Sequence, residues 1–394
     1  MVITMTNYQR LLNMVRARGM DAKWATMFVN KLSEDEEAFP TDDYIRRWAL
    51  RRGFFPGRVE LYGLTEGNYI HYMPDYSYFM IHPINHHFRI WVNDKLTLKY
   101  VLNNSGCEES MPEYYLYVEN NGHYTYLMDA PVSIKKDKDF IINLLKDKGC
   151  LAVKPNSGTS GGKGFMKMEW RDGSIHLNNK PMGTVQFAEL VGQLKNHIVT
   201  EYAHQHEDLA KMWGASECTL RVIMVKLPKS SRYDAAEWHS IVSYARFGSS
   251  VSGGASNLSS GGIGVGFDFA SGQLKDFGIR YKKFCSDGEY VCHEHPDTHM
   301  VWRDCGLPNW KYVKDVIERV CQYIGSLDYL GFDIVITSNG LKICEINTHP
   351  AINYEQIMCG PILSKGSSRR FFMKHGLYEV NNEEFYEMYM MSQE

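Results

Sequence analysis

The fold is decided by one stretch of the sequence, Gly331-Phe-Asp-Ile-Val-Ile-Thr-Ser-Asn-Gly-Leu-Lys-Ile-Cys-Glu-Ile-Asn347. Two apolar runs flank Asn339-Gly340, a dipeptide that readily accepts the positive φ angles of a tight hairpin turn. Pairing across this turn brings Asp333 roughly opposite Glu345. Glu345 and Asn347 are two residues apart, so they share one face of their strand. The stretch is therefore predicted to be a β-hairpin that carries three oxygen-bearing side chains.

These three side chains are suited to binding magnesium. Mg²⁺ requires hard oxygen ligands in near-octahedral geometry, and it usually takes one or two carboxylates and completes its shell with water and nucleotide phosphates. The hairpin therefore indicates a site for a metal nucleotide. The alternative is that the acidic residues lie on a solvated face, and the hairpin alone does not separate the two interpretations.

A second segment favours the nucleotide. Leu151-Ala-Val-Lys154 is a short apolar strand that ends in lysine, and a loop rich in Gly, Ser and Thr connects it to a further strand-like run from Phe165. Glycines let backbone N–H groups approach phosphate oxygens, and lysines supply positive charge there. The loop is not a Walker A motif, because Ser157 stands where that motif needs glycine and Gly164 where it needs Ser or Thr. A solvated hairpin loop is the alternative.

Together the two segments resemble the ATP-grasp superfamily, in which a glycine-rich loop between antiparallel strands closes over ATP and a metal-binding hairpin approaches from the other subdomain. The resemblance covers about residues 90 to 365. It implies an α/β (α+β) fold with two α+β subdomains that clamp ATP, preceded by a largely helical N-terminal region. We expect that region over 1–105, with a possible acceptor-binding role. The small subdomain with the glycine-rich loop is expected over 106–205, and the C-terminal subdomain with the magnesium hairpin and a tail over 206–394.

Hydrophobic periodicity agrees with this organisation. Thr41 is predicted to cap an amphipathic helix that runs to Leu50. Residues 110–205 predict short strands with one helix, over Thr184–Leu194. Further predicted elements are strands over 219–227 and 238–247 and a helix over 308–327.

The resemblance also assigns nucleotide contacts. A strand lysine that contacts the α- and β-phosphates is matched by Lys154, and an Asp-Lys helix start by Asp94-Lys95, with Lys99 as a competitor for that second basic role. An apolar strand that ends in Glu and leads to the adenine-binding backbone is matched by His197–Ala203. The ATP contacts so implied are Lys95, Lys154, Ser157, Gly158, Thr159, Ser160, Gly161, Gly162, Lys163, Glu201, Tyr202 and Ala203, with Glu207 or Asp208 at the ribose.

The family's metal pattern, an acid on one strand and Glu-x-Asn on the next, is matched by Asp333, Glu345 and Asn347. The resemblance gives them one or two Mg²⁺ ions, with Mn²⁺ as the other candidate. More narrowly, residues 219–223, 259–268 and 295–298 resemble the ATP-grasp proteins encoded with bacterial surface-polysaccharide genes. That group is called sugar-transfer-associated or teichuronopeptide-type.

Ligases of this kind transfer the γ-phosphoryl group of ATP to a carboxylate, and an amine then attacks the acylphosphate. The resemblance thus implies an ADP-forming ligase that makes a carbon–nitrogen bond. Its partners are a small-molecule or saccharide carboxylate, such as a uronic acid of a surface polysaccharide or its precursor, and an amino acid or amine. A peptide ligase, a small-molecule kinase and a non-catalytic ATP-binding regulator are the alternatives.

Candidate catalytic residues are Arg221, for steadying the acylphosphate, and Lys154. An arginine on a strand that faces the cleft can hold a carboxylate or phosphate with paired donors, although an ordinary ion pair explains Arg221 equally well. Asn257, Ser260 and His82 are weaker candidates for acceptor contacts. His82 lies in an aromatic segment that packing explains more readily than a substrate cleft.

Composition fits an enzyme of ordinary globular type. The 394 residues are 44% hydrophobic and 23% charged, and the formal net charge of −3 argues against broad nucleic-acid binding. The sequence shows neither an apolar run near the roughly 20 residues of a membrane helix nor a secretory h-region. Nine cysteines scattered through apolar contexts indicate reduced thiols, so we expect a cytoplasmic protein.

One cluster of potential metal ligands stands apart from the hairpin. Its members crowd the segment 285–305 but lack paired Cys-x₂-Cys units, so a His-rich loop is favoured over a zinc site. They are Cys285, Cys292, His293, His295, His299 and Cys305.

Overall fold

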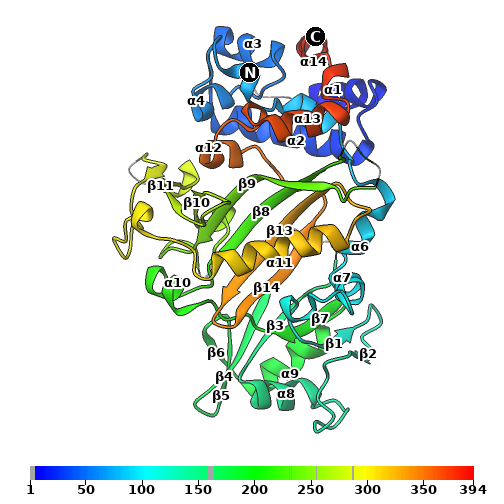
Figure 1. Ribbon diagram of the computed structural model, residues 1–394, viewed down its shortest axis with the longest axis vertical. Coiled ribbons are helices and arrows are strands. Elements are labelled where there is room, and N and C mark those ends of the chain that lie inside the picture. The colour runs from blue at the N-terminus through cyan, green and yellow to red at the C-terminus, as the bar shows by residue number, and fades with distance from the viewer. Residues whose placement is uncertain (1–4, 158–163, 230, 232, 254, 286–287) are drawn as a thin grey trace.

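Along its long axis the molecule has a layer of helices at one end, one antiparallel β-sheet in the middle and a second antiparallel β-sheet towards the other end (Figure 1). This computed structural model describes residues 5–157, 164–229, 231, 233–253, 255–285 and 288–394. The mixed α/β class predicted from the sequence is confirmed, as is the largely helical N-terminal region. Within the residues described, no helix combines the length and the apolar character that crossing a membrane requires.

The N-terminal region is helical as far as Leu102. Its helices are α1 (Met5–Ala17), α2 (Ala22–Ala38), α3 (Asp43–Arg51), α4 (Arg58–Tyr62), α5 (Asp75–Met80), α6 (Ile90–Asn93) and α7 (Lys95–Leu102). The residue that caps α3 is Asp42 and not Thr41, because the Asp42 Oδ1 atom accepts a hydrogen bond from the Ile45 N–H at 2.8 Å. A carboxylate at this position also interacts favourably with the helix dipole.

The last helices of the chain pack against the first ones. They are α12 (Glu355–Cys359), α13 (Gly366–Lys374) and α14 (Asn382–Gln393), at the same end of the molecule as α1 to α5 (Figure 1). Phe28 of α2 and Phe385 of α14 contact each other with ring centroids 5.1 Å apart. The two ends of the sequence therefore share one hydrophobic core.

A buried ion network lies inside this helical layer. The Arg58 guanidinium lies 3.2 Å from Asp35 and 3.3 Å from Asp75, and all three side chains are nearly inaccessible to water. The Phe55 and Gly57 N–H groups donate to the two carboxylates at 3.0 and 2.8 Å. Because both carboxylates depend on Arg58, the network holds the start of α4 against α2 and α5.

The first sheet has the strand order β2-β1-β7-β3-β4-β5-β6. Its strands are β1 (Tyr114–Val118), β2 (Tyr124–Tyr126), β3 (Cys150–Pro155), β4 (Met166–Arg171), β5 (Ser174–Leu177), β6 (Lys180–Met182) and β7 (His197–Glu201). Two helices accompany this sheet, α8 (Phe140–Lys148) and α9 (Thr184–Gln193), so the prediction of one helix was wrong. Helix α8 is only nine residues long, but its buried Phe140, Ile141, Leu144 and Leu145 recur at helical spacing, so the sequence did contain a signal for it.

The second sheet has the order β12-β11-β10-β9-β8-β13-β14. Its strands are β8 (Thr219–Leu227), β9 (Glu237–Phe247), β10 (Ile263–Phe267), β11 (Leu274–Ile279), β12 (Val291–Cys292), β13 (Tyr329–Thr337) and β14 (Gly340–Asn347). Helix α11 (Trp310–Tyr323) lies across one face of this sheet (Figure 1), and α10 (Glu207–Met212) follows the link from the first sheet. Strands β8 and β9 match their predicted positions within one residue. The division of the chain near residues 105 and 205 stays a prediction.

The predicted hairpin is confirmed, but its turn lies one residue earlier than expected. Thr337 pairs with Gly340, so the two-residue loop is Ser338-Asn339 and not Asn339-Gly340. Gly340 opens strand β14 with a φ angle of +133°, a value that side chains with a Cβ rarely adopt.

A β-bulge corrects the register that this turn would impose. Ile334 pairs with Ile343, and the next pair is Asp333 with Glu345, so Cys344 is the extra residue on β14. Without the bulge Asp333 would lie opposite Cys344. Bulges re-aim side chains near functional sites, and this one places the Asp333 and Glu345 carboxylates opposite each other.

We predict that Arg58→Ala destabilises the fold by about 3–5 kcal/mol, because it leaves the Asp35 and Asp75 carboxylates buried without their cation. Urea unfolding followed by circular dichroism measures the difference. Arg47→Ala, at an exposed position of α3, is the control and should change stability by less than about 0.5 kcal/mol. Equal stabilities of the two variants would show that the network does not support the helical layer.

Candidate active site

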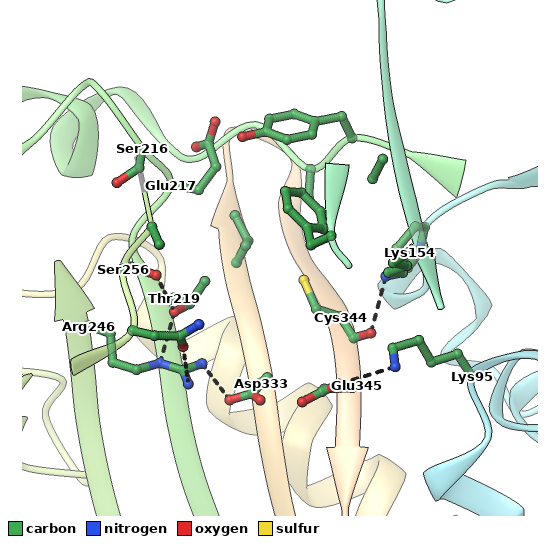
Figure 2. Close-up of a pocket in the computed structure, with 18 of the residues that line it drawn as sticks. Lys95, Lys154, Ser216, Glu217, Thr219, Arg246, Ser256, Asp333, Cys344 and Glu345 are labelled. Atoms are coloured by element: carbon green, nitrogen blue, oxygen red, sulfur yellow. Dashed lines mark hydrogen bonds and ion pairs between the residues drawn. The ribbon is translucent and has the colours of Figure 1, made fainter. Parts of the chain in front are cut away.

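A pocket of about 360 Å³ lies between the two sheets (Figure 2). Strands β3 and β7 of the first sheet and β8, β9, β13 and β14 of the second contribute side chains to its walls. Of the predicted site residues that the structure describes, it brings most together here. Those that line it are Lys95, Lys154, Glu201, Tyr202, Ala203, Arg221, Asn257, Ser260, Asp333 and Glu345.

The three side chains predicted to hold metal converge at the hairpin. The Asn347 Nδ2 atom donates to Asp333 Oδ2 at 3.3 Å and to Glu345 Oε1 at 3.1 Å. Figure 2 shows the Asp333 and Glu345 carboxylates side by side on adjacent strands, between Arg246 and Lys95. The set offers two carboxylates and one amide, which is the number and kind of oxygen donors that Mg²⁺ commonly takes from a protein. These residues therefore fit the ion.

The pKa values of the two carboxylates shift in opposite directions, upward for Asp333 and downward for Glu345. Burial raises the pKa of Asp333, and the adjacent Glu345 raises it further, although Arg221 and Arg246 oppose the shift. Burial also acts to raise the pKa of Glu345, but Lys95 and the hydrogen bonds with Asp333 and Asn347 lower it to about 2. Glu345 is thus ionised at neutral pH, and a cation placed between the two groups would favour the charged form of both.

Asp333 is held by two arginines from neighbouring strands. Arg221 of β8 donates to both carboxylate oxygens, at 2.8 Å from Nε and 3.0 Å from Nη2. Arg246 of β9 donates to Asp333 Oδ1 at 2.5 Å, to the Thr219 hydroxyl at 2.9 Å and to Asn257 Oδ1 at 3.3 Å. Each arginine is therefore fixed in the pocket wall by charge-assisted hydrogen bonds.

Sequence reasoning missed Arg246. The sequence did contain a signal, because this arginine interrupts a strand whose other residues from Ile241 to Phe247 are mostly apolar. A strongly charged residue is almost never buried without a partner, so its position in a core strand indicates a carboxylate nearby.

Two lysines lie on the opposite wall from Arg246 (Figure 2). Lys95 directly follows Asp94, the cap of α7, whose Oδ1 atom accepts a hydrogen bond from the Thr97 N–H at 2.8 Å. The Lys95 Nζ atom lies 3.4 Å from Glu345 Oε2. Lys154 Nζ donates to the Cys344 carbonyl at 3.4 Å. Burial lowers the pKa of Lys154, and the neighbouring Lys95 lowers it further.

Lys99 does not line the pocket. Its Nζ atom lies 2.9 Å from Asp129 Oδ2 and donates to the Pro112 carbonyl at 2.9 Å. Of the two basic residues that competed for the second phosphate contact, Lys95 is therefore the one whose side chain the structure places in the pocket.

The other end of the pocket is largely apolar and begins at the end of β7. Ala152, Phe165, Val335 and Cys344 line it together with Tyr202. These side chains form a surface that a flat aromatic base can contact, with the backbone that follows β7 along its edge.

The acidic residues at this end are not those predicted for the ribose. Glu217 lines the pocket, and its Oε2 atom accepts from the Gln205 N–H at 2.7 Å. Glu207 and Asp208 lie exposed at the start of α10, outside the pocket, and Asp208 pairs with Lys211 at 2.7 Å. Glu201 lines the pocket, but its carboxylate pairs with Lys342 at 3.0 Å. Sequence spacing could not identify Glu217, because α10 separates it from the end of β7.

The sequence pattern of the family described as sugar-transfer associated ATP-grasp matches residues 80–368. The chain belongs to this family. No curated protein matches the sequence.

Solved structures resemble the chain at low identity. D-alanyl-alanine synthetase A from Vibrio cholerae O1 biovar eltor shares 13% identity, with 74% of this chain and 66% of that chain covered and a TM-score of 0.38. Biotin carboxylase from Campylobacter jejuni shares 11%, with 70% and 45% covered and a TM-score of 0.35. N5-carboxyaminoimidazole ribonucleotide synthetase from Thermotoga maritima shares 11%, with 69% and 49% covered and a TM-score of 0.32. In each case the chain spans less than two thirds of the known protein.

In this sugar-transfer-associated ATP-grasp protein, one side of the pocket is formed by residues of the Gly- and Ser-rich loop that follows β9, namely Ala255, Ser256, Asn257 and Ser260. The buried His295 side chain holds the loop at its start, with its Nε2 atom 2.9 Å from the Gly248 carbonyl. Asp297 Oδ2 accepts from the Ser250 N–H at 3.0 Å. The His-rich segment thus anchors this loop. Across the described part of the chain, no three His, Cys, Asp or Glu side chains gather as a metal site.

The remaining predicted contacts lie outside the pocket or outside the described residues. Ser157 ends the described part of the loop after β3 and is not a lining residue. His82 is 3% exposed within the helical layer, and its Nδ1 atom lies 2.6 Å from the Tyr78 carbonyl. Gly158, Thr159, Ser160, Gly161, Gly162 and Lys163 lie outside the described residues.

We predict that Glu217→Gln weakens ADP binding about tenfold, because the Glu217 carboxylate is placed to accept hydrogen bonds from the ribose hydroxyls of ADP. A hydrogen bond to a charged acceptor contributes roughly 1.5–3 kcal/mol, and the amide retains part of it. Isothermal titration calorimetry with ADP measures the effect. Glu207→Gln is the matched control at an exposed position and should leave the dissociation constant unchanged. Weaker ADP binding by Glu207→Gln than by Glu217→Gln would show that the ribose is bound by α10 and not by Glu217.

Proposed function

We propose that this protein is an ATP-dependent carboxylate–amine ligase, which activates an acid as its acylphosphate and joins it to an amine with release of ADP and phosphate. One observation carries the proposal. Two lysines, the Asp333 and Glu345 carboxylates and two arginines line one pocket between the two sheets, and Asn347 donates hydrogen bonds to both carboxylates. Membership of an ATP-grasp family supports the same conclusion.

The pocket has an apolar end and a charged end, and this difference sets the orientation in which ATP binds. The apolar end accepts the adenine ring, with the backbone of Tyr202 and Ala203 at its edge, and Glu217 accepts hydrogen bonds from the ribose hydroxyls. Lys95 and Lys154 bind the phosphates through their ammonium groups. Positive groups fixed before the reaction stabilise the charge that spreads over a transferring phosphoryl group.

Mg²⁺ would be held by Asp333, Glu345 and Asn347, where it would neutralise the phosphate charge. Asp333 must keep its orientation for this, and its bonds to Arg221 and Arg246 restrain both of its oxygens. The hydrogen bonds of Asn347 to both carboxylates hold the same group together. The arginines therefore act as supporting partners of the metal site, as such neighbours do in other metal proteins.

The proposed reaction has two steps. A carboxylate oxygen of the acceptor attacks the γ-phosphorus of ATP, and the bond from phosphorus to the bridging oxygen of ADP breaks. The amine nitrogen then attacks the carbonyl carbon, phosphate leaves with the former carboxylate oxygen, and the nitrogen loses a proton. Arg221 and Arg246 are the candidates for stabilising the acylphosphate, and Asn257 and Ser260 lie where the acceptor would approach Arg246.

The acceptor is proposed to be a saccharide carboxylate such as a uronic acid, and the nucleophile an amino acid or amine. The family's association with sugar transfer supports this choice.

We predict ADP and phosphate in equal amounts only when an acid and an amine are both supplied. A panel of uronic acids, sugar-linked carboxylates, amino acids and simple amines, tested singly and in pairs with Mg²⁺ and ATP, identifies the substrates. Glu345→Gln should lower turnover by at least about 100-fold, the scale of losing a partner in transition-state charge stabilisation. Exposed Glu379→Gln is the control. ADP with a stable phosphorylated acceptor and no free phosphate would instead make the protein a kinase.

A further inference from the structure

The side chain of Asn85 joins both strands of the hairpin at the end opposite its turn. Asn85 belongs to the helical N-terminal region, between α5 and α6, and is 5% exposed. Its Nδ2 atom donates to the Tyr329 carbonyl of β13 at 2.5 Å and to the Thr348 carbonyl, just after β14, at 3.3 Å. Its Oδ1 atom accepts from the Asp328 N–H at 2.8 Å and the Tyr329 N–H at 3.2 Å.

These contacts replace a missing step of the β-ladder. The last pair of β13 with β14 is Gly331 with Asn347, because β14 ends at Asn347. Beyond it, Leu330 and Tyr329 of β13 still pair with β8, but no further pair with β14 forms between the two described strands. The carboxamide of Asn85 bonds both the N–H and the carbonyl of Tyr329, as the backbone of a partner strand would.

A second asparagine completes the attachment. Asn93, the last residue of α6, accepts hydrogen bonds at its Oδ1 atom from the Thr348 N–H at 3.2 Å and from the Thr348 hydroxyl at 3.1 Å. The N–H, hydroxyl and carbonyl of Thr348 are therefore all bound by Asn85 and Asn93. Thr348 directly follows Asn347, so the end of β14 is fixed to the helical region at the residue next to the proposed metal ligand.

The adjoining loop is held from the same side. The hydroxyls of Tyr78 in α5 and Tyr329 both donate to the Pro350 carbonyl, at 2.9 and 3.0 Å. Pro350 lies so close to Gly331 that a Cβ atom on that glycine would come within 2.5 Å of it. Both strand ends are thus packed together beside the carboxylates.

We infer that Asn85 and Asn93 are positioning residues for the metal site, which fix the end of β14 so that Asn347 and Glu345 face Asp333. The inference rests on the proposed function. Asn347 is the last residue of β14, so the paired residues of the ladder restrain it only from the side of Ile346. Residues that hydrogen-bond metal ligands typically contribute 10- to 100-fold to metal affinity. Asn85 and Asn93 bind Thr348, the residue after the proposed ligand Asn347, and not the ligand itself.

The test measures metal binding and not turnover. The affinity of the protein for Mn²⁺ with saturating ADP is obtained from the electron paramagnetic resonance signal of unbound Mn²⁺, and the affinity for ADP is measured separately in EDTA. Asn93→Ala should weaken Mn²⁺ binding about tenfold and leave the metal-free ADP affinity within twofold. Asn93 is exposed, so its replacement does not open the core. Asn85→Ala should have the larger effect.

Two further variants separate positioning from a general loss of structure. Asn93→Asp retains the oxygen that Thr348 uses and should restore the Mn²⁺ affinity that alanine loses. Asn68→Ala is the matched control, because among the contacts described the Asn68 side chain bonds only the nearby Thr65 N–H and Gly63 carbonyl. This variant should bind Mn²⁺ like the wild type.

Wild-type Mn²⁺ affinity in both Asn93→Ala and Asn85→Ala would overturn the inference and leave the proposed function intact. If Asn85→Ala does not fold, Asn93→Ala and Asn93→Asp decide alone. Absence of Mn²⁺ binding by the wild type with ADP would overturn the metal site of the proposed function, and the inference with it.

Discussion

The buried carboxylate of Asp333 is the group on which the rest of the site depends. A carboxylate removed from water is destabilised unless cations and hydrogen bonds surround it, and Asp333 receives both from Arg221 and Arg246. These contacts tie β13 to β8 and β9 at one level of the sheet. Lys95 then balances Glu345 from the other wall. At this end of the pocket four cationic side chains, Lys95 and Lys154 with the two arginines, face two carboxylates, which suits a polyanionic ligand.

The hairpin shows what the sequence predicts well and where such reasoning stops. Two apolar runs around a turn signal, with acids at the right spacing, predict the hairpin and its three oxygen-bearing side chains. The turn lies one residue earlier than predicted, and the bulge at Cys344 brings Glu345 back opposite Asp333. A bulge depends on packing against the neighbouring strands and has no local sequence signal here, so the correct alignment was predicted without its cause.

The same limit explains the other differences. Lys154 and Lys95 were predicted because each matches a local feature to which the family resemblance assigns a phosphate contact, a lysine at a strand end and an Asp-Lys helix start. Arg246 and Glu217 enter the pocket through tertiary contacts between segments distant in sequence, which spacing does not reveal. Glu207 and Asp208 looked suitable because they follow β7 closely, but helix α10 begins there and exposes them to solvent.

The helical layer, much of which precedes the matched region, is part of this arrangement. Residues 1–79 lie before that region, yet they supply Asp75, which binds Asn353, and Tyr78, which binds Pro350. The ion network of Arg58 holds Asp75 in place. The buried ion pair of Arg58 and Asp75 thus contacts the loop after β14 through Asn353, and this loop continues the strand that carries Glu345 and Asn347.

The proposed reaction passes through an acylphosphate, and the fate of the acceptor's carboxylate oxygen shows whether that intermediate forms. The acid that supports turnover is labelled with ¹⁸O in its carboxylate and supplied with ATP, Mg²⁺ and the amine. Mass spectrometry of the released phosphate then shows whether the oxygen was transferred. One ¹⁸O atom in each phosphate is the predicted result, because phosphate leaves with the oxygen that attacked the γ-phosphorus. Unlabelled phosphate, with both ¹⁸O atoms outside it, would contradict activation of the acid by phosphoryl transfer.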